Sequence, residues 1–453
     1  MKKLPITYNQ DLPLAVVSDN PLTFLQLGSL FNNFTIVTTN SRLWHDQGLT
    51  QAKFNILNLK GSGTPASIVR SKKLNEYAKQ NPKSLFLVYS PIDPPYKINP
   101  LSLLMNSPTL THAYENKRYF REEFADSIRM PEYEIRYLAK LDKAVAYREL
   151  QETYGVFVLQ DEESSGSKGT FIVRNYDDYA AAITTLKQNA KGRSVVVSKY
   201  IEGINASVQV CITKYGIFSG GIQYQLMAEK ELCNPKLDGA TTWCGGEVGA
   251  NASVILQHQA HEIATIVGNE LSSHGYKGIF GIDILVTPDN EVYAIEINAR
   301  LTGYSHILSD LQMQNGKIPF MLLHILELGN LNYEVTDLNS LPGFASYKRP
   351  VSYLVINNPK DDDFKLTKQV RGGIYSLKGN KIEFVREGSS LSQLKGDDMF
   401  FLFCNKEKGE LIGRGKRIAN IMKAGPVFTS KNTLLHKHEN LIRAIKSHFA
   451  LPQ

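Results

Sequence analysis

Two alternating runs decide the fold of this chain: Gly281-Ile282-Asp283-Ile284-Leu285-Val286 and Val292-Tyr293-Ala294-Ile295-Glu296-Ile297-Asn298. Alternation of apolar and polar residues is typical of half-buried β-strands, and the residues between the runs, Pro288-Asp289-Asn290, are typical of a turn. A two-residue Asp289-Asn290 turn would place Asp283 directly opposite Glu296, with Asn298 on the same face. The other face then points to the core and carries Ile282, Ile284, Ile295 and Ile297.

The polar face of this hairpin favours a metal site. Two facing carboxylates, Asp283 and Glu296, repel each other unless a cation lies between them. With the carboxamide of Asn298 they form the set of hard oxygen donors that Mg²⁺ prefers. Arg300 follows at once and is suited to holding a phosphate by parallel hydrogen bonds. A solvated strand face explains the two acidic residues equally well, and a one-residue slip in register would separate them.

The pattern Gly-x-Asp followed by Glu-x-Asn-x-Arg, with Asp and Glu thirteen residues apart, resembles the metal-binding end of ATP-grasp enzymes. That family includes D-alanine–D-alanine ligase, biotin carboxylase and many amino-acid and peptide ligases. The resemblance implies ATP as a substrate and Mg²⁺, with Mn²⁺ as the alternative, held by Asp283, Glu296 and Asn298. It also implies a catalytic role for Arg300.

The order of segments favours an α/β (α+β) protein. Residues 1–105 alternate short apolar strands with helix-length stretches, which predicts a parallel α/β domain ending near a proline-rich segment. The resemblance implies that this domain precedes an ATP-grasp nucleotide-binding domain at 106–340, whose lid subdomain covers about 140–200. Residues 341–453 are predicted to form a small mixed C-terminal domain.

The segment 161–170 contains glycine, serine and lysine between two strands, which suits a phosphate-covering loop as well as an ordinary hairpin tip. Its position matches the phosphate-covering lid of ATP-grasp enzymes. On that resemblance Lys117 contacts phosphate and the segment Lys199-Tyr200-Ile201 reads adenine. As bare residues both lysines are more typical of an exposed surface, and only their position in the pattern favours the functional interpretation. The loop residues implied to bind nucleotide are Ser165, Gly166, Ser167, Lys168, Gly169 and Thr170.

Two residues depart from the family pattern. Gln160 stands where the family usually has a lysine, and Asn205 stands where a glutamate often holds the ribose. Both replacements keep hydrogen-bonding ability and lose charge, so they bear on nucleotide affinity and choice. The resemblance places the loop Gly303-Tyr304-Ser305-His306 near the acyl substrate. The segment Gly245–Gly249 is interpreted as a loop, either mobile over the acceptor or an ordinary surface loop.

Composition narrows the class of protein. The net charge of +7, from 51 basic and 44 acidic residues, gives no dense basic stripe, so nucleic acid is not an expected partner. No apolar run reaches the length of a membrane span and no signal peptide is visible. The four cysteines have no metal-binding spacing and predict reduced thiols of a cytoplasmic protein. A homodimer is one open alternative for the oligomeric state.

The resemblance implies a ligase that joins a small carboxylate, such as an amino acid or peptide, to an amine through an acylphosphate. Three alternatives stay open at this point. The same fold serves kinases, and the losses of charge at Gln160 and Asn205 suit a non-catalytic nucleotide-binding protein. A carboxylase is less favoured because the chain has no Met-Lys-Met biotin-attachment segment.

Overall fold

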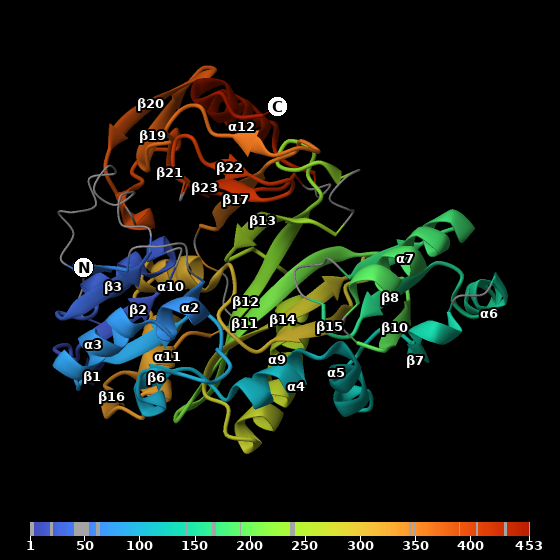
Figure 1. Ribbon diagram of the computed structural model, residues 1–453, viewed down its shortest axis with the longest axis horizontal. Helices are drawn as coiled ribbons and strands as arrows, with labels where there is room; N and C mark the ends of the chain where they lie inside the picture. Colours follow the sequence, from blue (N-terminus) through green and yellow to red (C-terminus); the bar gives the residue numbers. More distant parts are fainter. Residues whose placement is uncertain are drawn as a thin grey trace.

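The computed structural model describes residues 4–18, 21–39, 54–59, 64–141, 144–164, 169–190, 192–235, 241–343, 347, 349–388, 390–404, 406–429 and 433–452. Three masses of structure surround a central sheet (Figure 1). The N-terminal part lies on one side, the segment with β7 to β10 on the other, and the C-terminal part above them. A parallel sheet and a large antiparallel sheet together confirm the predicted α/β class.

The N-terminal part is the predicted parallel sheet, in the strand order β4-β3-β2-β5-β6. Its strands are β2 (Leu14–Val17), β3 (Phe34–Thr38), β4 (Asn55–Asn58), β5 (Leu85–Val88) and β6 (Leu103–Leu104). The connecting helices are η1 (Pro21–Ser29), α2 (Pro65–Val69), α3 (Lys72–Gln80) and η3 (Pro100–Ser102). The central strands are buried, as expected for parallel strands covered on both faces.

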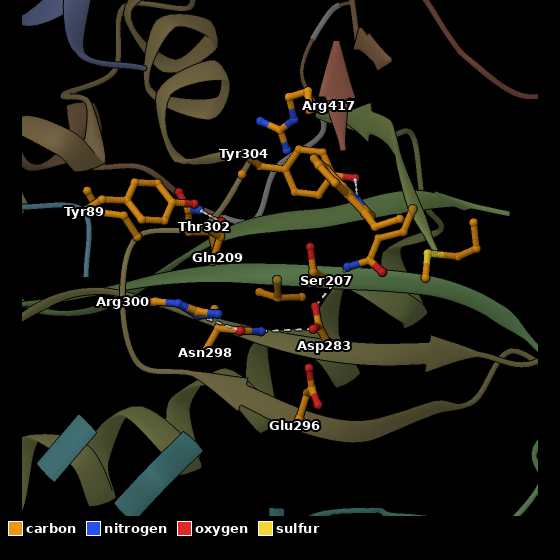
Figure 2. A pocket seen from close by; sticks show the side chains of 17 residues that line it. Tyr89, Ser207, Gln209, Asp283, Glu296, Asn298, Arg300, Thr302, Tyr304 and Arg417 are labelled. Carbon is orange, nitrogen blue, oxygen red and sulfur yellow. Dashed lines mark hydrogen bonds between the residues drawn. The ribbon is translucent and has the colours of Figure 1, made fainter. Parts of the chain in front are cut away.

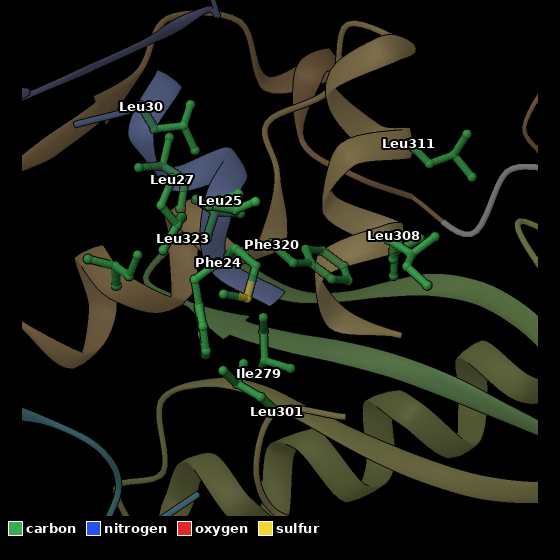
Figure 3. Packing of buried hydrophobic residues seen from close by; sticks show 14 of the residues in the cluster. Phe24, Leu25, Leu27, Leu30, Ile279, Leu301, Leu308, Leu311, Phe320 and Leu323 are labelled. Carbon is green, nitrogen blue, oxygen red and sulfur yellow. The ribbon is translucent and has the colours of Figure 1, made fainter. Parts of the chain in front are cut away.

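The N-terminal part is fixed to the rest of the molecule by an apolar cluster (Figure 3). Phe24 and Leu27 of η1 are fully buried and belong to the same cluster as Leu308 of α10 (Ser305–Gln314) and Phe320 of α11 (Phe320–Leu328). Full burial of side chains of this size contributes about 1.5–3 kcal/mol each. In addition, β1 (Ile6–Tyr8) pairs with β16 (Tyr333–Val335), so the start of the chain is joined to residues far along it.

The central sheet has ten strands within the described residues, in the order β15-β14-β11-β12-β13-β17-β23-β21-β19-β20. It runs without a break from the hairpin of Asp283 into the C-terminal part, because β13 pairs with β17. Its strands are β11 (Ile204–Thr213), β12 (Gly216–Met227), β13 (Trp243–Val248), β14 (Gly278–Val286), β15 (Val292–Asn298), β17 (Val351–Asn357), β19 (Gly373–Lys378), β20 (Lys381–Arg386), β21 (Met399–Phe403) and β23 (Arg417–Ala424).

The helix α9 (Val254–Ser273) covers the face of the central sheet opposite Asp283 and Glu296, whereas α10 and α11 pack on the same face as Asp283, near Ile279. The helix α9 begins at Ser253, whose side chain accepts a hydrogen bond from the backbone of Leu256. Its buried positions Ile263, Val267 and Leu271 follow helical spacing, and the helix packs against β11 and β12. The remaining helices and short strands are α4 (Pro108–Glu115), α5 (Lys117–Phe124), α12 (His436–Phe449), η5 (Leu338–Ser340), η6 (Leu391–Gln393), β18 (Phe364–Lys365) and β22 (Leu411–Ile412).

The hairpin of β14 and β15 contains the predicted pair of Asp283 and Glu296, but its strands pair differently by one residue near the turn. Asp283 faces Glu296, as predicted, but the strands close at Val286 and Val292 through a connection longer than two residues. Asn290 takes a left-handed φ of 61° in that connection. A β-bulge between Asp283 and Ile284 shifts the register by one residue and restores the pair. The bulge also makes one prediction wrong: Ala294 is fully buried in place of Ile295, which is only half-buried.

A smaller antiparallel sheet, in the order β7-β10-β8-β9, is formed by the part of the chain that is expected to be the lid. Its elements are β7 (Tyr133–Tyr137), β8 (Phe157–Asp161), β9 (Thr170–Val173), β10 (Ser194–Lys199), η4 (Leu138–Lys140), α6 (Ala144–Tyr154) and α7 (Tyr176–Asn189). Tyr147, Phe157 and Tyr179 pack in its own core. It lies on the far side of the hairpin from the N-terminal part (Figure 1).

The expectation of a loop at Gly245–Gly249 is wrong. Most of this segment is the buried strand β13, between β12 and β17. The glycines allow close approach of neighbouring strands, because a Cβ on Gly245, whose φ is 113°, would lie 2.0 Å from the carbonyl oxygen of Tyr353. Adjacent glycines are typical of loops, and nothing local in the sequence distinguishes the two cases.

Two further expectations concern the whole chain. All four cysteines are buried, and none forms a disulfide in the described structure. No helix among the described residues is long and apolar enough to cross a membrane.

Candidate active site

The hairpin brings four polar side chains into one hydrogen-bonded group. Asn298 Nδ2 lies 3.0 Å from Asp283 Oδ2, and Asn298 Oδ1 accepts a bond of 2.8 Å from Arg300 Nη1. Asp283 Oδ1 accepts a second bond, 2.9 Å long, from Gln225 Nε2 of β12. Glu296 lies next to Asp283 across the strand pair. The group arises because these side chains share the polar face of neighbouring strands, opposite the face that packs on α9.

The helix α5 supplies positive charge to this group. Lys117 Nζ lies 3.1 Å from Glu296 Oε2, and its side chain is only 5% exposed. The same ammonium donates a 2.6 Å bond to the carbonyl oxygen of Ser164, which follows β8. Arg121, one helical turn further, is also buried, and burial lowers its pKa to about 10 while the charge of Glu296 opposes this shift. Lys117 therefore joins the acidic pair to the backbone at Ser164, just after β8.

The two facing carboxylates differ in their acid strength. Burial, followed by the negative charge of Glu296, raises the pKa of Asp283. Burial is also the largest single effect on the pKa of Glu296 and raises it, but the ammonium of Lys117, the hydrogen bond with Asp283 and the charge of Arg300 together lower this pKa. Glu296 is therefore the ionised member of the pair, and Asp283 retains a proton to higher pH than an ordinary aspartate.

These residues line one end of a cavity of about 350 Å³, which we call the central cavity (Figure 2). Asp283, Glu296, Asn298 and Arg300 lie along β14 and β15, and Tyr304 and Arg417 lie on the opposite side. The volume is within the range of small-molecule sites. Its other described lining residues are Tyr89, Ser207, Val208, Gln209, Gln225, Met227, Trp243, Gly281, Leu301, Thr302 and Gly303.

Only part of the predicted substrate loop, Gly303 to His306, lines the central cavity. Gly303 and Tyr304 line the central cavity, and Tyr304 donates a 2.8 Å hydrogen bond to the carbonyl oxygen of Gly245. Ser305 begins α10 and is fully buried; its Oγ accepts bonds from the backbone of Thr302 and from Gln209 Nε2. His306 lines a different cavity. Ser305 therefore supports the loop rather than facing the central cavity.

The predicted nucleotide residues lie in three places. Lys117 reaches the acidic pair, whereas Gln160 is buried in β8 with its Nε2 3.4 Å from Thr170 Oγ1. Gly169 accepts the backbone hydrogen bond of Asp161, and a Cβ there would lie 2.5 Å from Ser164 Cβ. Residues Ser165, Gly166, Ser167 and Lys168 lie outside the described residues.

The expected adenine segment extends past the end of β10. Lys199 is exposed and lies 3.9 Å from Glu132, Tyr200 donates a backbone bond to Val156, and Asn205 is exposed at the start of β11. These residues and Ile201 are absent from the described lining of the central cavity. Their role in binding adenine and ribose remains a prediction.

The donor set fits a magnesium ion. Asp283, Glu296 and the carbonyl oxygen of Asn298 are hard ligands, and substrate phosphates commonly complete such a site. The described residues contain no cluster of three His, Cys, Asp or Glu side chains at metal-binding separation, so the carboxamide would be the third protein ligand. Asn298 would have to turn its oxygen toward the ion, since its nitrogen is now placed beside Asp283.

Several lining residues could not be found from the sequence. Gln225 and Arg417 are far along the chain from the motif and reach it only through the order of strands in the central sheet. Glu115, which bonds Arg300 Nη1 at 3.1 Å, precedes Lys117 but belongs to no recognisable pattern. Tyr89 directly follows β5, at the edge of a parallel sheet where ligands commonly bind. That position is the one feature of the sequence that could have indicated Tyr89 as a site residue.

Comparison with known protein families identifies the domain that contains the hairpin of β14 and β15. Residues 114–304 match the family model described as the ATP-grasp domain. This chain therefore carries an ATP-grasp domain.

The fold of nearly the whole chain is similar to solved structures. One is the biotin carboxylase–β,γ-ATP complex from Campylobacter jejuni, with a TM-score of 0.60, 12% identity, and coverage of 91% of this chain and 87% of that one. Another is the biotin carboxylase domain of Hydrogenobacter thermophilus 2-oxoglutarate carboxylase with MgADP and bicarbonate. Its TM-score is 0.58 at 12% identity, and the match covers 91% of this chain and 86% of that one. A third is the L-amino acid ligase from Bacillus licheniformis, with a TM-score of 0.56, 13% identity, and coverage of 96% of this chain and 97% of that one.

Replacing Lys117 with methionine is expected to destabilise the metal-free protein by about 2 kcal/mol, since Glu296 would lose its partner in a half-buried site. Added MgCl₂ should raise the thermal unfolding midpoint more in this variant than in the wild type, because the cation replaces the missing charge. Differential scanning fluorimetry with and without MgCl₂ measures both effects. Exposed Lys72→Met is the control; equal responses to MgCl₂ in wild type and Lys117→Met would contradict this role.

Magnesium affinity is expected to increase with pH. The raised pKa of Asp283 means that a proton must leave before this carboxylate binds a cation, so below that pKa the affinity should change by about tenfold per pH unit. Titration of Mg²⁺ with a non-hydrolysable ATP analogue at several pH values measures this, after correction for protons bound by the analogue alone. A flat profile from about pH 5.5 to 8.5 would argue against a metal role for Asp283.

Proposed function

We propose that this protein is an ATP- and Mg²⁺-dependent ligase that forms an amide or peptide bond between a small carboxylate and an amine. The observation that supports this most is the group Asp283, Glu296, Asn298, Arg300 and Lys117 at one end of a ligand-sized cavity in an ATP-grasp domain. The similar structures named above include both an amino acid ligase and carboxylases that bind nucleotide, which agrees with carboxylate activation.

In the first step, an oxygen of the substrate carboxylate attacks the γ-phosphorus of ATP. The bond from that phosphorus to the β–γ bridging oxygen breaks, giving an acylphosphate and ADP. Mg²⁺, when bound by Asp283, Glu296 and Asn298, supplies charge neutralisation at the phosphates. Arg300 is held by Nη1 through Asn298 and Glu115, and among the described residues its Nη2 and Nε make no side-chain bonds, so they are available to a phosphate oxygen.

In the second step, the amine nitrogen attacks the acyl carbon and inorganic phosphate leaves with the electrons of the C–O bond. The amine proton is lost to phosphate or solvent. Lys117 contacts both Ser164 and Glu296, so it would couple the position of the segment at Ser164 to the phosphate site. Exclusion of water by the lid would protect the acylphosphate from hydrolysis.

The experiment that tests this function is a screen for ADP release over pairs of carboxylates and amines, followed by mass analysis of the products. The expected result is ADP release that depends on both partners, with a product lighter than the sum of the two by one water. Phosphorylated acceptor without amide would indicate a kinase, and product carrying added CO₂ from bicarbonate would indicate a carboxylase. Binding of MgATP without ADP release from any pair would indicate a non-catalytic protein.

A further inference from the structure

A second cavity, of about 850 Å³, lies next to the central cavity. Tyr89, Gly303 and Arg417 line both cavities, so the two adjoin at these residues. The walls of the second cavity come from the N-terminal part, around Thr64–Ala66 and Ser90–Ile92, and from the C-terminal part, around Leu411–Gly413. The space is large enough for a complete small substrate whose reacting end enters the central cavity.

The described lining of this second cavity is positively charged. It contains Lys406, Lys416 and Arg417 and no aspartate or glutamate. The charge of Lys406 is compensated, because its Nζ lies 2.6 Å from Glu410 Oε1. In the described part of the chain, no carboxylate oxygen lies within 4 Å of Lys416 Nζ or of the Arg417 guanidinium nitrogens. Two of the three positive charges therefore have no anionic partner.

Arg417 lies beside aromatic side chains that line the central cavity. Its guanidinium lies 5.8 Å from the centre of the Trp243 ring, and Trp243 Nε1 donates a 3.1 Å bond to Tyr304 Oη. His306 also lines the cavity, and burial, followed by the charge of Arg417, lowers its pKa to about 3, so the imidazole is neutral. A half-buried guanidinium among aromatic rings, without a carboxylate, is stabilised when an anion binds beside it.

We propose that the second cavity holds the body of the ligase substrate and that Arg417, assisted by Lys416, selects a substrate carrying an additional anionic group, a carboxylate or a phosphate. This inference rests on the proposed function. Arg300 binds the phosphoryl group that is transferred to the reacting carboxylate, whereas Arg417 binds the second anionic group of the same substrate. The two arginines lie on opposite sides of the central cavity (Figure 2). The recognised anion therefore differs from the carboxylate that is activated.

Matched pairs of probes test this proposal by calorimetric titration into the full-length protein saturated with MgADP. L-Glutamate is compared with L-glutamine, and O-phospho-L-serine with L-serine, so that each pair differs in one anionic group. The expected result is that the anionic member of at least one pair binds about tenfold more tightly. The pair that shows the difference identifies carboxylate or phosphate as the recognised group.

The variant Arg417→Gln should remove most of this difference. Arg414→Gln is the matched control, since Arg414 is an exposed residue of the same segment that pairs with Asp361 and lines neither cavity in the described structure. Arg414→Gln should keep the preference of the wild type. No discrimination in either pair, or discrimination that survives in Arg417→Gln, would overturn the proposal.

ADP release measured on the same preparations separates this proposal from the proposed function. Carboxylate- and amine-dependent ADP release without preference for anionic probes would overturn the role of Arg417 and leave the ligase assignment intact. Preference for anionic probes with no ADP release from any pair in the screen would overturn the ligase assignment instead.

Discussion

Replacing Glu296 with glutamine is expected to reduce ATP-dependent ADP formation by about 10³-fold, equivalent to a loss of about 4 kcal/mol of transition-state stabilisation. Glu296 is the ionised member of the facing pair, because Lys117 lowers its pKa below the ordinary range. The amide keeps the size and one oxygen of the carboxylate and loses the charge that holds a cation. Steady-state ADP release at saturating MgATP measures the effect.

The fold of the Glu296→Gln variant should be intact. The glutamine oxygen can still accept the hydrogen bond of Lys117, and Lys117 keeps its bond to the carbonyl of Ser164. Glu291→Gln is the matched control, since Glu291 lies beside the same strand but pairs with Arg129 at the exposed end of the hairpin. Near-normal turnover by Glu296→Gln, with Mg²⁺ dependence unchanged, would refute the metal assignment.

Replacing Arg300 with lysine is expected to lower kcat by about 10²-fold with a smaller change in KM for ATP. Lysine retains the charge but not the planar fork, so it cannot bond Asn298 and Glu115 while also presenting two donors to a phosphate. The transition state should lose more than the ground state, because charge develops on the phosphoryl oxygens. Steady-state kinetics over a range of ATP concentrations separate kcat from KM.

Arg129→Lys provides the control for this substitution. Arg129 is an exposed arginine whose side chain pairs with Glu291, at the turn end of the same hairpin. Its replacement should change neither constant by more than about twofold, as expected for a surface ion pair. An Arg300→Lys variant as active as Arg129→Lys would remove the guanidinium from the reaction.

The part of the fold that could be predicted has strong local signals. Buried apolar runs gave the parallel strands β2, β3 and β5, and helical spacing gave α9. Pairing of Asp283 with Glu296 was predicted correctly, although the assumed turn was too short and a β-bulge supplied the missing residue. The two deviations cancel at the pair, and only the burial of Ala294 in place of Ile295 reveals them.

The part that could not be predicted depends on contacts between distant segments. Gly245 was interpreted as part of a loop because its need for close packing against Tyr353 is visible only when β17 is in place. Arg417 reaches the cavities because β23 lies next to β17 in a sheet that continues from the ATP-grasp domain into the C-terminal part. No spacing of residues in the sequence predicts that β23 lies next to β17. The chemical motif was therefore readable, whereas the residues that surround it were not.

The measurement that tests the central claim most directly is binding of Mn²⁺, a spectroscopic substitute for Mg²⁺, followed by electron paramagnetic resonance with a non-hydrolysable ATP analogue. Asp283, Glu296 and Asn298 together should give stoichiometric Mn²⁺ binding in the wild-type protein that requires the analogue. Asp283→Asn and Glu296→Gln should each reduce the affinity by about tenfold or more, whereas Glu291→Gln should not. Unchanged Mn²⁺ affinity in both site variants would contradict the account.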